Sequence, residues 1–158
     1  MNVDVITKLI KKNLSISSME SCTGGLLAST ITDVSGASAI FPGSLVTYSN
    51  EAKIKSGVLE NIINEYGVYS ANTAEAMAKA SCEYFDTKIG VGITGTLDRV
   101  DPNNGDSISG IVYYSIRYLD KYYNCELQVP CDLNNRHDKK EYVVNEILKS
   151  IKNYILFD

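Results

Sequence analysis

Hydrophobic positions follow helical spacing at both ends of the chain and alternate between helical and strand spacing in the middle. Residues 3–12 and residues 138–155 each place apolar side chains at every third or fourth position, which predicts two amphipathic helices. Elsewhere, serine or asparagine before an apolar segment and glycine after it mark the ends of helices. By these signals, further helices are predicted from Leu26 to about Asp33, from Asn50 to Gly57, from Leu59 to Tyr66 and from Ser70 onward.

Five shorter apolar segments have the spacing or composition of β-strands, and they are interleaved with the helices. They span residues 14–19, 44–48, 88–94, 111–119 and 123–129. The last two are separated by a short segment that includes Asp120 and Lys121, which predicts an antiparallel hairpin with its turn at residues 120–121. Residues 95–109 are rich in Asp, Asn, Gly and Ser and predict one long loop. This order predicts a single α/β domain over residues 1–158, a three-layer α/β/α sandwich with a mixed, mainly parallel sheet and a late antiparallel hairpin.

Composition restricts the function classes more than it identifies one. The chain has 158 residues, of which 44% are hydrophobic and 22% charged, with a formal net charge of -4. A nucleic-acid binder normally presents a basic face to phosphates, so that class is not expected. No apolar segment has the length of a membrane span. With one histidine and no C-x-x-C pair among four cysteines, a Cys/His zinc site is not expected either. We expect a cytoplasmic protein with reduced thiols.

The segment Glu20-Ser21-Cys22-Thr23-Gly24-Gly25 stands where a predicted strand turns into a predicted helix. Backbone N–H groups in the first turn of a helix lack intrahelical partners, and glycines let a ligand approach them closely. Two functional interpretations follow: an anion-binding turn, or an oxyanion hole beside a nucleophilic Ser21. The simpler alternative is a serine that caps the helix in a tight turn.

A nucleophilic serine needs a base. The single histidine, His137, lies near the start of the last helix, so a Ser-His-Asp triad is not expected. A lysine serves as base when burial or a neighbouring cation lowers its pKa. Lys53, in the segment 47–53, is the candidate, although most helical lysines are simply solvated.

Several segments together resemble one known family, the C-terminal domain of the competence/damage-inducible protein CinA, which also occurs alone as nicotinamide-nucleotide amidase. The resemblance covers nearly the whole chain, and its first two segments are long and specific. It rests on Glu20-Ser-Cys-Thr-Gly-Gly-Leu-Leu-Ala28, Gly36-Ala-Ser-Ala-Ile-Phe41, Val46-Thr-Tyr-Ser-Asn-Glu-Ala-Lys53, Gly57-Val58, Tyr66-Gly67-Val68, Ala74-Glu-Ala-Met-Ala78 and Ile93-Thr94-Gly95. We expect the chain to lack the N-terminal domain that full-length CinA carries.

The resemblance implies hydrolysis of the carboxamide of nicotinamide mononucleotide to nicotinate mononucleotide and ammonia. It assigns Ser21 as nucleophile, Lys53 as general base and Tyr48 as a residue that relays or orients a proton. It implies no metal and no organic cofactor, a pyridine nucleotide as the small-molecule partner, and a homo-oligomer. Oxyanion and substrate-binding roles are implied for Glu20, Cys22, Thr23, Gly24, Gly25, Asn50, Thr94, Gly95, Arg136 and Lys140.

The sequence departs from the family pattern around the expected substrate pocket. Family members carry a glycine-rich segment after the Thr-Gly pair, whereas residues 96–109 here include Asp98, Asp101 and Asp106. These acids would repel a phosphate unless Arg99 turns inward, and the simplest interpretation is that they face water. Lys140 replaces a family arginine, keeping the charge without the bidentate fork.

These departures leave three hypotheses about activity. The first is an active amidase on nicotinamide mononucleotide or a close pyridine relative. The second is a nucleotide-binding or regulatory homologue without turnover, and the third is an amidase acting on another small amide.

Overall fold

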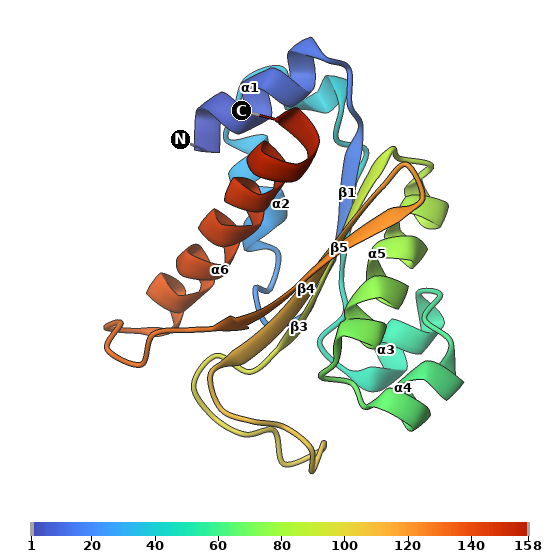
Figure 1. Ribbon diagram of the computed structural model, residues 1–158, viewed down its shortest axis with the longest axis vertical. Helices are drawn as coiled ribbons and strands as arrows, with labels where there is room; N and C mark the ends of the chain where they lie inside the picture. The colour runs from blue at the N-terminus through green and yellow to red at the C-terminus, as the bar shows by residue number, and fades with distance from the viewer. Residues whose placement is uncertain (1, 158) are drawn as a thin grey trace.

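The computed structural model describes residues 2–157, which form a five-stranded mixed sheet between two layers of helices (Figure 1). The strand order is β2-β1-β3-β4-β5. β2 and β3 flank β1 and run parallel to it, whereas β4 and β5 pair antiparallel to their neighbours. The strands span Ile16–Glu20 (β1), Ser44–Val46 (β2), Ile89–Gly95 (β3), Ile111–Tyr118 (β4) and Lys121–Gln128 (β5). The predicted sandwich with a mixed sheet and a late hairpin is therefore confirmed.

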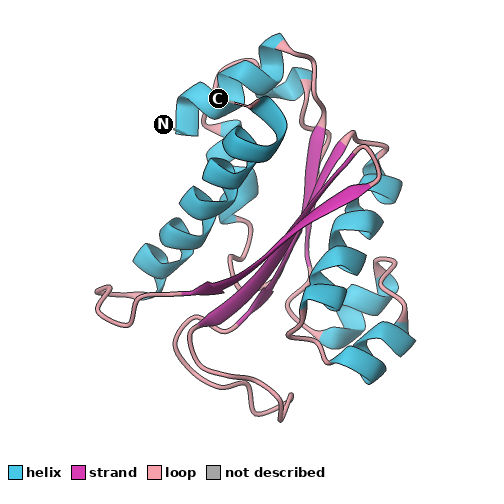
Figure 2. Cartoon of the chain, viewed as in Figure 1, coloured by secondary structure: helices cyan, strands magenta, loops and turns pink. Residues whose placement is uncertain are grey.

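Helices cover both faces of the sheet (Figure 2). On one side lie α1 (Asn2–Lys11), α2 (Leu26–Thr32) and α6 (Arg136–Ile151), and on the other α3 (Asn50–Lys55), α4 (Glu60–Tyr66) and α5 (Ala71–Phe85). Apolar side chains of α1, α2 and α6 join those of the strands in the larger of two cores. A smaller core lies between the sheet and α4 and α5. No helix within residues 2–157 is long and apolar enough to cross a bilayer.

Element boundaries differ from the predicted ones by a few residues, and the reasons are local. The hairpin turn falls on Leu119 and Asp120 rather than on residues 120–121, because both residues adopt left-handed backbone conformations (φ 52° and 60°). Two such residues in a row are the signature of the tight turn that matches strand twist. The final helix continues from α6 into a π-helical turn at Lys152–Leu156, and a short 3-10 helix, Ala37–Ala39, was not predicted.

Helix α5 packs unusually close to the central strand β3. A Cβ atom added at Gly92 would lie 2.1 Å from the carbonyl oxygen of Ala74, and one at Gly90 would lie 2.4 Å from that of Ala78. Only glycine leaves room for this approach. The glycines of β3 therefore permit a close backbone contact between this strand and α5.

The topology brings three strand ends to one edge of the sheet. β1, β2 and β3 are parallel, so the residues after Glu20, Val46 and Gly95 emerge side by side. The first turn of α6 and the loop at residues 96–110 lie at the same end of the molecule (Figure 1). Ligand sites in open α/β sheets form at such edges.

Candidate active site

A cavity of about 740 Å³ opens at this edge of the sheet. Its walls come from the turn after β1, the segment between β2 and α3, the loop after β3 and the first residue of α6. The lining residues include Ser21, Cys22, Tyr48, Asn50, Tyr69, Gly95, Asp98, Arg99, Asp101, Asn104 and Arg136.

Ser21 lines this cavity, and it contacts Lys53, a buried residue 32 positions later in the chain that is not among the lining residues. Lys53 Nζ donates hydrogen bonds to Ser21 Oγ at 3.2 Å and to the carbonyl oxygen of Thr47 at 2.8 Å. Lys53 is 2% exposed and Ser21 6%. When the amine is neutral, the same contact lets Ser21 donate its hydroxyl proton to Nζ.

Burial lowers the pKa of Lys53 from 10.5 to about 8, because the ammonium form loses its hydration. The negative charge of Asp101 acts in the opposite direction at longer range. Among residues 2–157, no carboxylate forms an ion pair with Lys53. A lysine without such a partner is more easily deprotonated, as a general base requires.

Helix α3 aims Lys53 inward. Its N-cap is Ser49, whose hydroxyl accepts a hydrogen bond from the Ala52 N–H at 3.0 Å. Lys53 is the one buried residue of this helix, whereas Lys55 is exposed and pairs with Glu51. The short capped helix thus fixes the stem of Lys53 between the strand edge and the core.

Glu20, predicted to contact substrate, is fully buried and its carboxylate is turned toward α2. It accepts hydrogen bonds from Thr23 Oγ1 at 2.7 Å, from Leu27 N at 3.0 Å and from Ala28 N at 2.9 Å. These contacts satisfy N–H groups of the first turn of α2 and favour a negative charge there. Glu20 therefore holds the turn that carries Ser21 and has no free face toward the cavity.

The turn after Ser21 depends on two glycines with left-handed backbones, Gly24 (φ 59°) and Gly25 (φ 99°). The Gly24 N–H donates to the Ser21 carbonyl at 2.9 Å, so this predicted oxyanion donor is already committed to the turn. Within residues 2–157, the N–H groups of Cys22, Thr23 and Gly25 have no backbone acceptor. They are therefore the candidate oxyanion donors of this turn.

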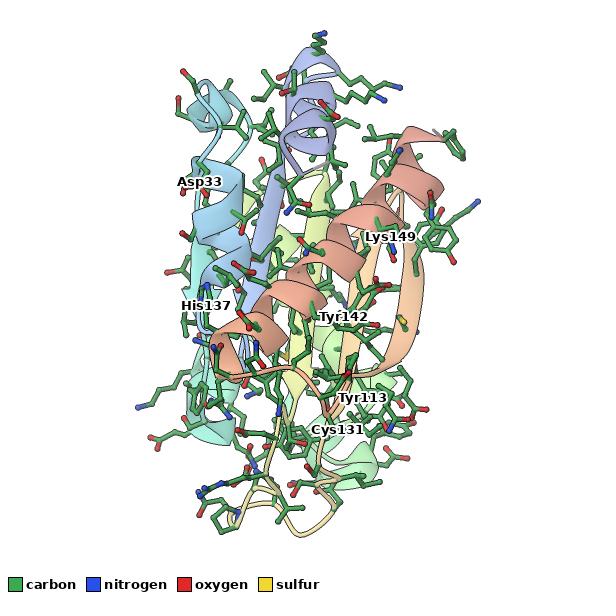
Figure 3. All side chains as sticks on the ribbon, turned by 90° about the vertical axis from the view of Figure 1, so that its left-hand side faces the viewer. Asp33, Tyr113, Cys131, His137, Tyr142 and Lys149 are labelled. Carbon is green, nitrogen blue, oxygen red and sulfur yellow. The ribbon has the colours of Figure 1, made fainter. Side chains whose placement is uncertain are left out.

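Cys22 lines the cavity, but burial raises the pKa of its thiol to about 12. The thiol is therefore uncharged at neutral pH and a weak nucleophile. His137 does not line the cavity: it lies exposed in the first turn of α6 (Figure 3), where its ring contacts Glu141. Lysine is thus the base that the structure presents to Ser21.

Tyr48, Asp98 and Arg136 form a linked group at the mouth of the cavity. Arg136 donates through Nη2 to the Tyr48 hydroxyl at 3.2 Å and through Nη1 to the Asp98 carboxylate. Tyr48 is 66% exposed, and its hydroxyl is hydrogen-bonded to Arg136 rather than to Ser21 or Lys53. Its predicted proton-relay role stays a prediction.

A second network ties the loop after β3 to the far wall. Asn50 donates to Asn104 at 2.9 Å, Asn104 donates to Asp101 at 2.7 Å, and Tyr69 donates to the same Asp101 oxygen at 2.6 Å. Hydrogen bonds from Tyr69 and Asn104 lower the pKa of Asp101. The loop acids were expected to face water. Asp106 is exposed, whereas Asp98 and Asp101 are partly exposed and each is also bound by a neighbouring side chain.

Three other predicted site residues lie around the cavity with different surroundings. Thr94 is fully buried, and its hydroxyl donates to the Val68 carbonyl at 2.9 Å. Thr94 therefore lies behind the residues that line the cavity. Gly95 lines the cavity and packs tightly against β4. Lys140 is not a lining residue; its Nζ lies 3.4 Å from where a Cβ on Gly24 would stand.

Sequence reasoning missed the Thr47 carbonyl, which holds Lys53, as well as Tyr69 and Asn104. Thr47 stands in the segment 46–53 that carries the resemblance, so its position was the available signal. Tyr69 and Asn104 meet only through the fold and give no sequence signal.

Comparison with known proteins agrees with this architecture. The chain is 36% identical over 151 residues to a competence-damage inducible relative from Clostridium acetobutylicum, covering 94% of this chain and 35% of the relative. It is 43% identical over 116 residues to a CinA-like protein of Flavobacterium psychrophilum, covering 71% of this chain and 27% of that protein. The chain thus spans about a third of the length of these relatives.

Solved structures show the same fold across nearly the whole chain. The competence/damage inducible protein CihA from Agrobacterium tumefaciens superimposes with a TM-score of 0.85 at 24% identity, covering 96% of this chain and 92% of that one. A CinA superfamily protein from Klebsiella pneumoniae gives a TM-score of 0.87 at 18% identity, covering 99% and 96%. Residues 1–155 match the CinA C-terminal domain, and the chain belongs to that family.

Proposed function

We propose that this chain is an amidohydrolase that uses Ser21 and Lys53 to convert nicotinamide mononucleotide to nicotinate mononucleotide and ammonia. The observation that carries the proposal is the buried contact between Lys53 Nζ and the Oγ of Ser21, which lines the cavity. A nucleophile and a base within hydrogen-bond reach, with the base itself oriented by the Thr47 carbonyl, is the arrangement that acyl transfer requires.

The residues have the following roles in this proposal. Neutral Lys53 accepts the Ser21 hydroxyl proton as Oγ attacks the amide carbon. The resulting ammonium of Lys53 then returns that proton to the amide nitrogen, so that ammonia leaves and an ester to Ser21 remains. Water attacks the ester while Lys53 accepts one of its protons, and the acid departs as Ser21 regains its hydroxyl proton.

Negative charge that develops on the amide oxygen needs donors beside Ser21. The uncommitted N–H groups of Cys22, Thr23 and Gly25 supply them from the backbone. Backbone donors in a fixed turn need no reorganisation during the reaction, which is how such groups stabilise a tetrahedral intermediate. Glu20 supports this indirectly, because its carboxylate holds the turn in place.

The test is ammonia release from nicotinamide mononucleotide by the purified protein, with nicotinate mononucleotide identified as the second product. Ser21→Ala and Lys53→Met should each lower kcat/KM by at least about a thousandfold, as removal of a nucleophile or its base does elsewhere. Ser29→Ala, on the exposed side of α2, and Lys55→Met, on the exposed side of α3, are the matched controls and should keep full activity.

Three outcomes separate the hypotheses. Product release that depends on Ser21 and Lys53 supports the amidase. Binding of nicotinate mononucleotide without any turnover supports a nucleotide-binding homologue. Turnover of other amides with the same dependence on Ser21, but none of nicotinamide mononucleotide, supports an amidase of different specificity.

A further inference from the structure

At the mouth of the cavity, Arg136 and Asp98 already form an ion pair with each other. Arg136 is the first residue of α6, and its guanidinium contacts both the Asp98 carboxylate and the Tyr48 hydroxyl. Asp98 belongs to the loop that departs from the family pattern. Its own carbonyl accepts a hydrogen bond from Ser109 Oγ at 2.8 Å, which ties the Asp98 backbone across the loop.

This pairing changes what Arg136 offers to a ligand. A guanidinium binds phosphate through two parallel hydrogen bonds from its planar fork. Here one N–H of Nη1 is bound to a carboxylate and one N–H of Nη2 to a phenol, so the carboxylate already balances the charge of the guanidinium. A phosphate must displace Asp98 or share Arg136 with a second negative charge close by.

The other charged residues of the cavity do not supply a net positive charge for a phosphate. Its charged lining residues are two acids, Asp98 and Asp101, and two bases, Arg99 and Arg136. Arg99 is exposed, so solvent screens its charge. Lys140, expected to help bind phosphate, lies at the turn beside Gly24 rather than in the lining.

We propose that Asp98 sets the substrate preference of this site: it occupies Arg136 as an internal anion, so that nicotinamide nucleosides without a phosphate are accepted about as well as the mononucleotide. The inference deepens the proposed amidase function and rests on it for the identity of the ligands. The amide end of either ligand meets Ser21 in the same way, and the two differ only at the end that faces Arg136.

The experiment is calorimetric binding of nicotinamide mononucleotide and nicotinamide riboside to the Ser21→Ala protein, which prevents turnover during titration. In this background the two Kd values should agree within about threefold. Adding Asp98→Asn frees Arg136 and should tighten mononucleotide binding about tenfold, the size of one charge-assisted hydrogen bond, with riboside binding unchanged.

Two further variants separate a local effect from a general one. Asp106→Asn makes the same change of charge in the same loop, but Asp106 lies beside Gly67 outside this cavity, so both affinities should stay the same. Arg136→Gln alone should change mononucleotide affinity by less than about threefold, since Asp98 already neutralises it. In the double variant, Arg136→Gln should abolish the tighter mononucleotide binding that Asp98→Asn produces.

The inference is overturned if the Ser21→Ala protein binds the mononucleotide tenfold or more tightly than the riboside, or if it binds neither. It is also overturned if Asp98→Asn, in a folded protein, leaves the ratio of the mononucleotide Kd to the riboside Kd unchanged. The same holds if Asp106→Asn shifts this ratio as much as Asp98→Asn does. If Asp98→Asn does not fold, a tenfold loss of mononucleotide affinity in Arg136→Gln overturns it instead. Absence of ammonia release by wild type removes the amidase proposal but leaves these binding ratios to decide this one.

Discussion

Substitution of Lys53 by methionine tests whether burial keeps its amine from holding a proton. Methionine keeps an unbranched apolar stem in the same buried position and removes the titrating group. The free energy of unfolding should then lose a pH-dependence that wild type has. The substitution also removes the hydrogen bonds to Thr47 and Ser21, but those losses do not vary with pH in the same way.

The sign and size follow from the pKa of Lys53, which is about 8 in the folded chain against 10.5 for an ordinary lysine. Between these values the unfolded chain holds a proton that the folded chain does not, so stability rises with pH across this window. The interval of about 2.5 pH units corresponds to about 3 kcal/mol. Below pH 8 the folded state bears this full cost of burying the ammonium.

The assay is urea unfolding at about pH 7 and about pH 9.5, with wild type and Lys53→Met compared at each pH. Wild type should gain about 2 kcal/mol relative to the variant over this interval. Cys22, whose raised pKa makes stability fall above pH 9, is present in both proteins and largely cancels. Lys55→Met, an exposed lysine of the same helix, should show no such change.

A difference between wild type and Lys53→Met that stays constant with pH would refute this reasoning. It would mean that the ammonium is hydrated or paired in the folded protein. An increase in the relative stability of the variant at high pH would require a raised rather than a lowered pKa.

Three further substitutions test the framework of the site. Glu20→Gln should cost roughly 2–4 kcal/mol in urea unfolding, because the buried donors of α2 lose a charged acceptor. Gly92→Ala should cost roughly 1–3 kcal/mol, because the new Cβ collides with the α5 backbone, whereas Gly105→Ala meets no atom within 4 Å and should be tolerated. Tyr48→Phe should change KM by less than about threefold and leave kcat nearly unchanged if the hydroxyl only contacts Arg136, and a hundredfold fall in kcat would instead support the proton relay.

Much of the fold could be predicted because each element carries its own periodicity. The apolar stripe of α6, the glycines of β3 and the serine before α5 are local signals, and each corresponds to an observed feature. The hairpin turn lies one residue earlier than predicted, because Leu119 adopts a left-handed conformation that is uncommon for leucine. Chain order alone does not encode such an exception.

In the candidate site, too, the residues with a local motif could be predicted, whereas the contacts that depend on the fold could not. Ser21 and Lys53 were identified from their motifs, but their contact depends on two parallel strands and on the inward face of a six-residue helix. Glu20 lies next to Ser21 in sequence and was assigned to substrate, yet strand alternation turns its side chain away toward α2. The pairing of Asp98 with Arg136 joins residues 38 positions apart and has no local signal.

The most direct test of the central claim is the rate at which a small sulfonyl fluoride modifies Ser21, measured by peptide mass spectrometry as a function of pH. This reagent reports activation of the hydroxyl without requiring knowledge of the substrate. The structure predicts labelling confined to Ser21, with a rate that rises through an apparent pKa of about 8 and that is lost in Lys53→Met. Labelling at equal rates in wild type and Lys53→Met, or spread over several serines, would contradict activation of Ser21 by Lys53.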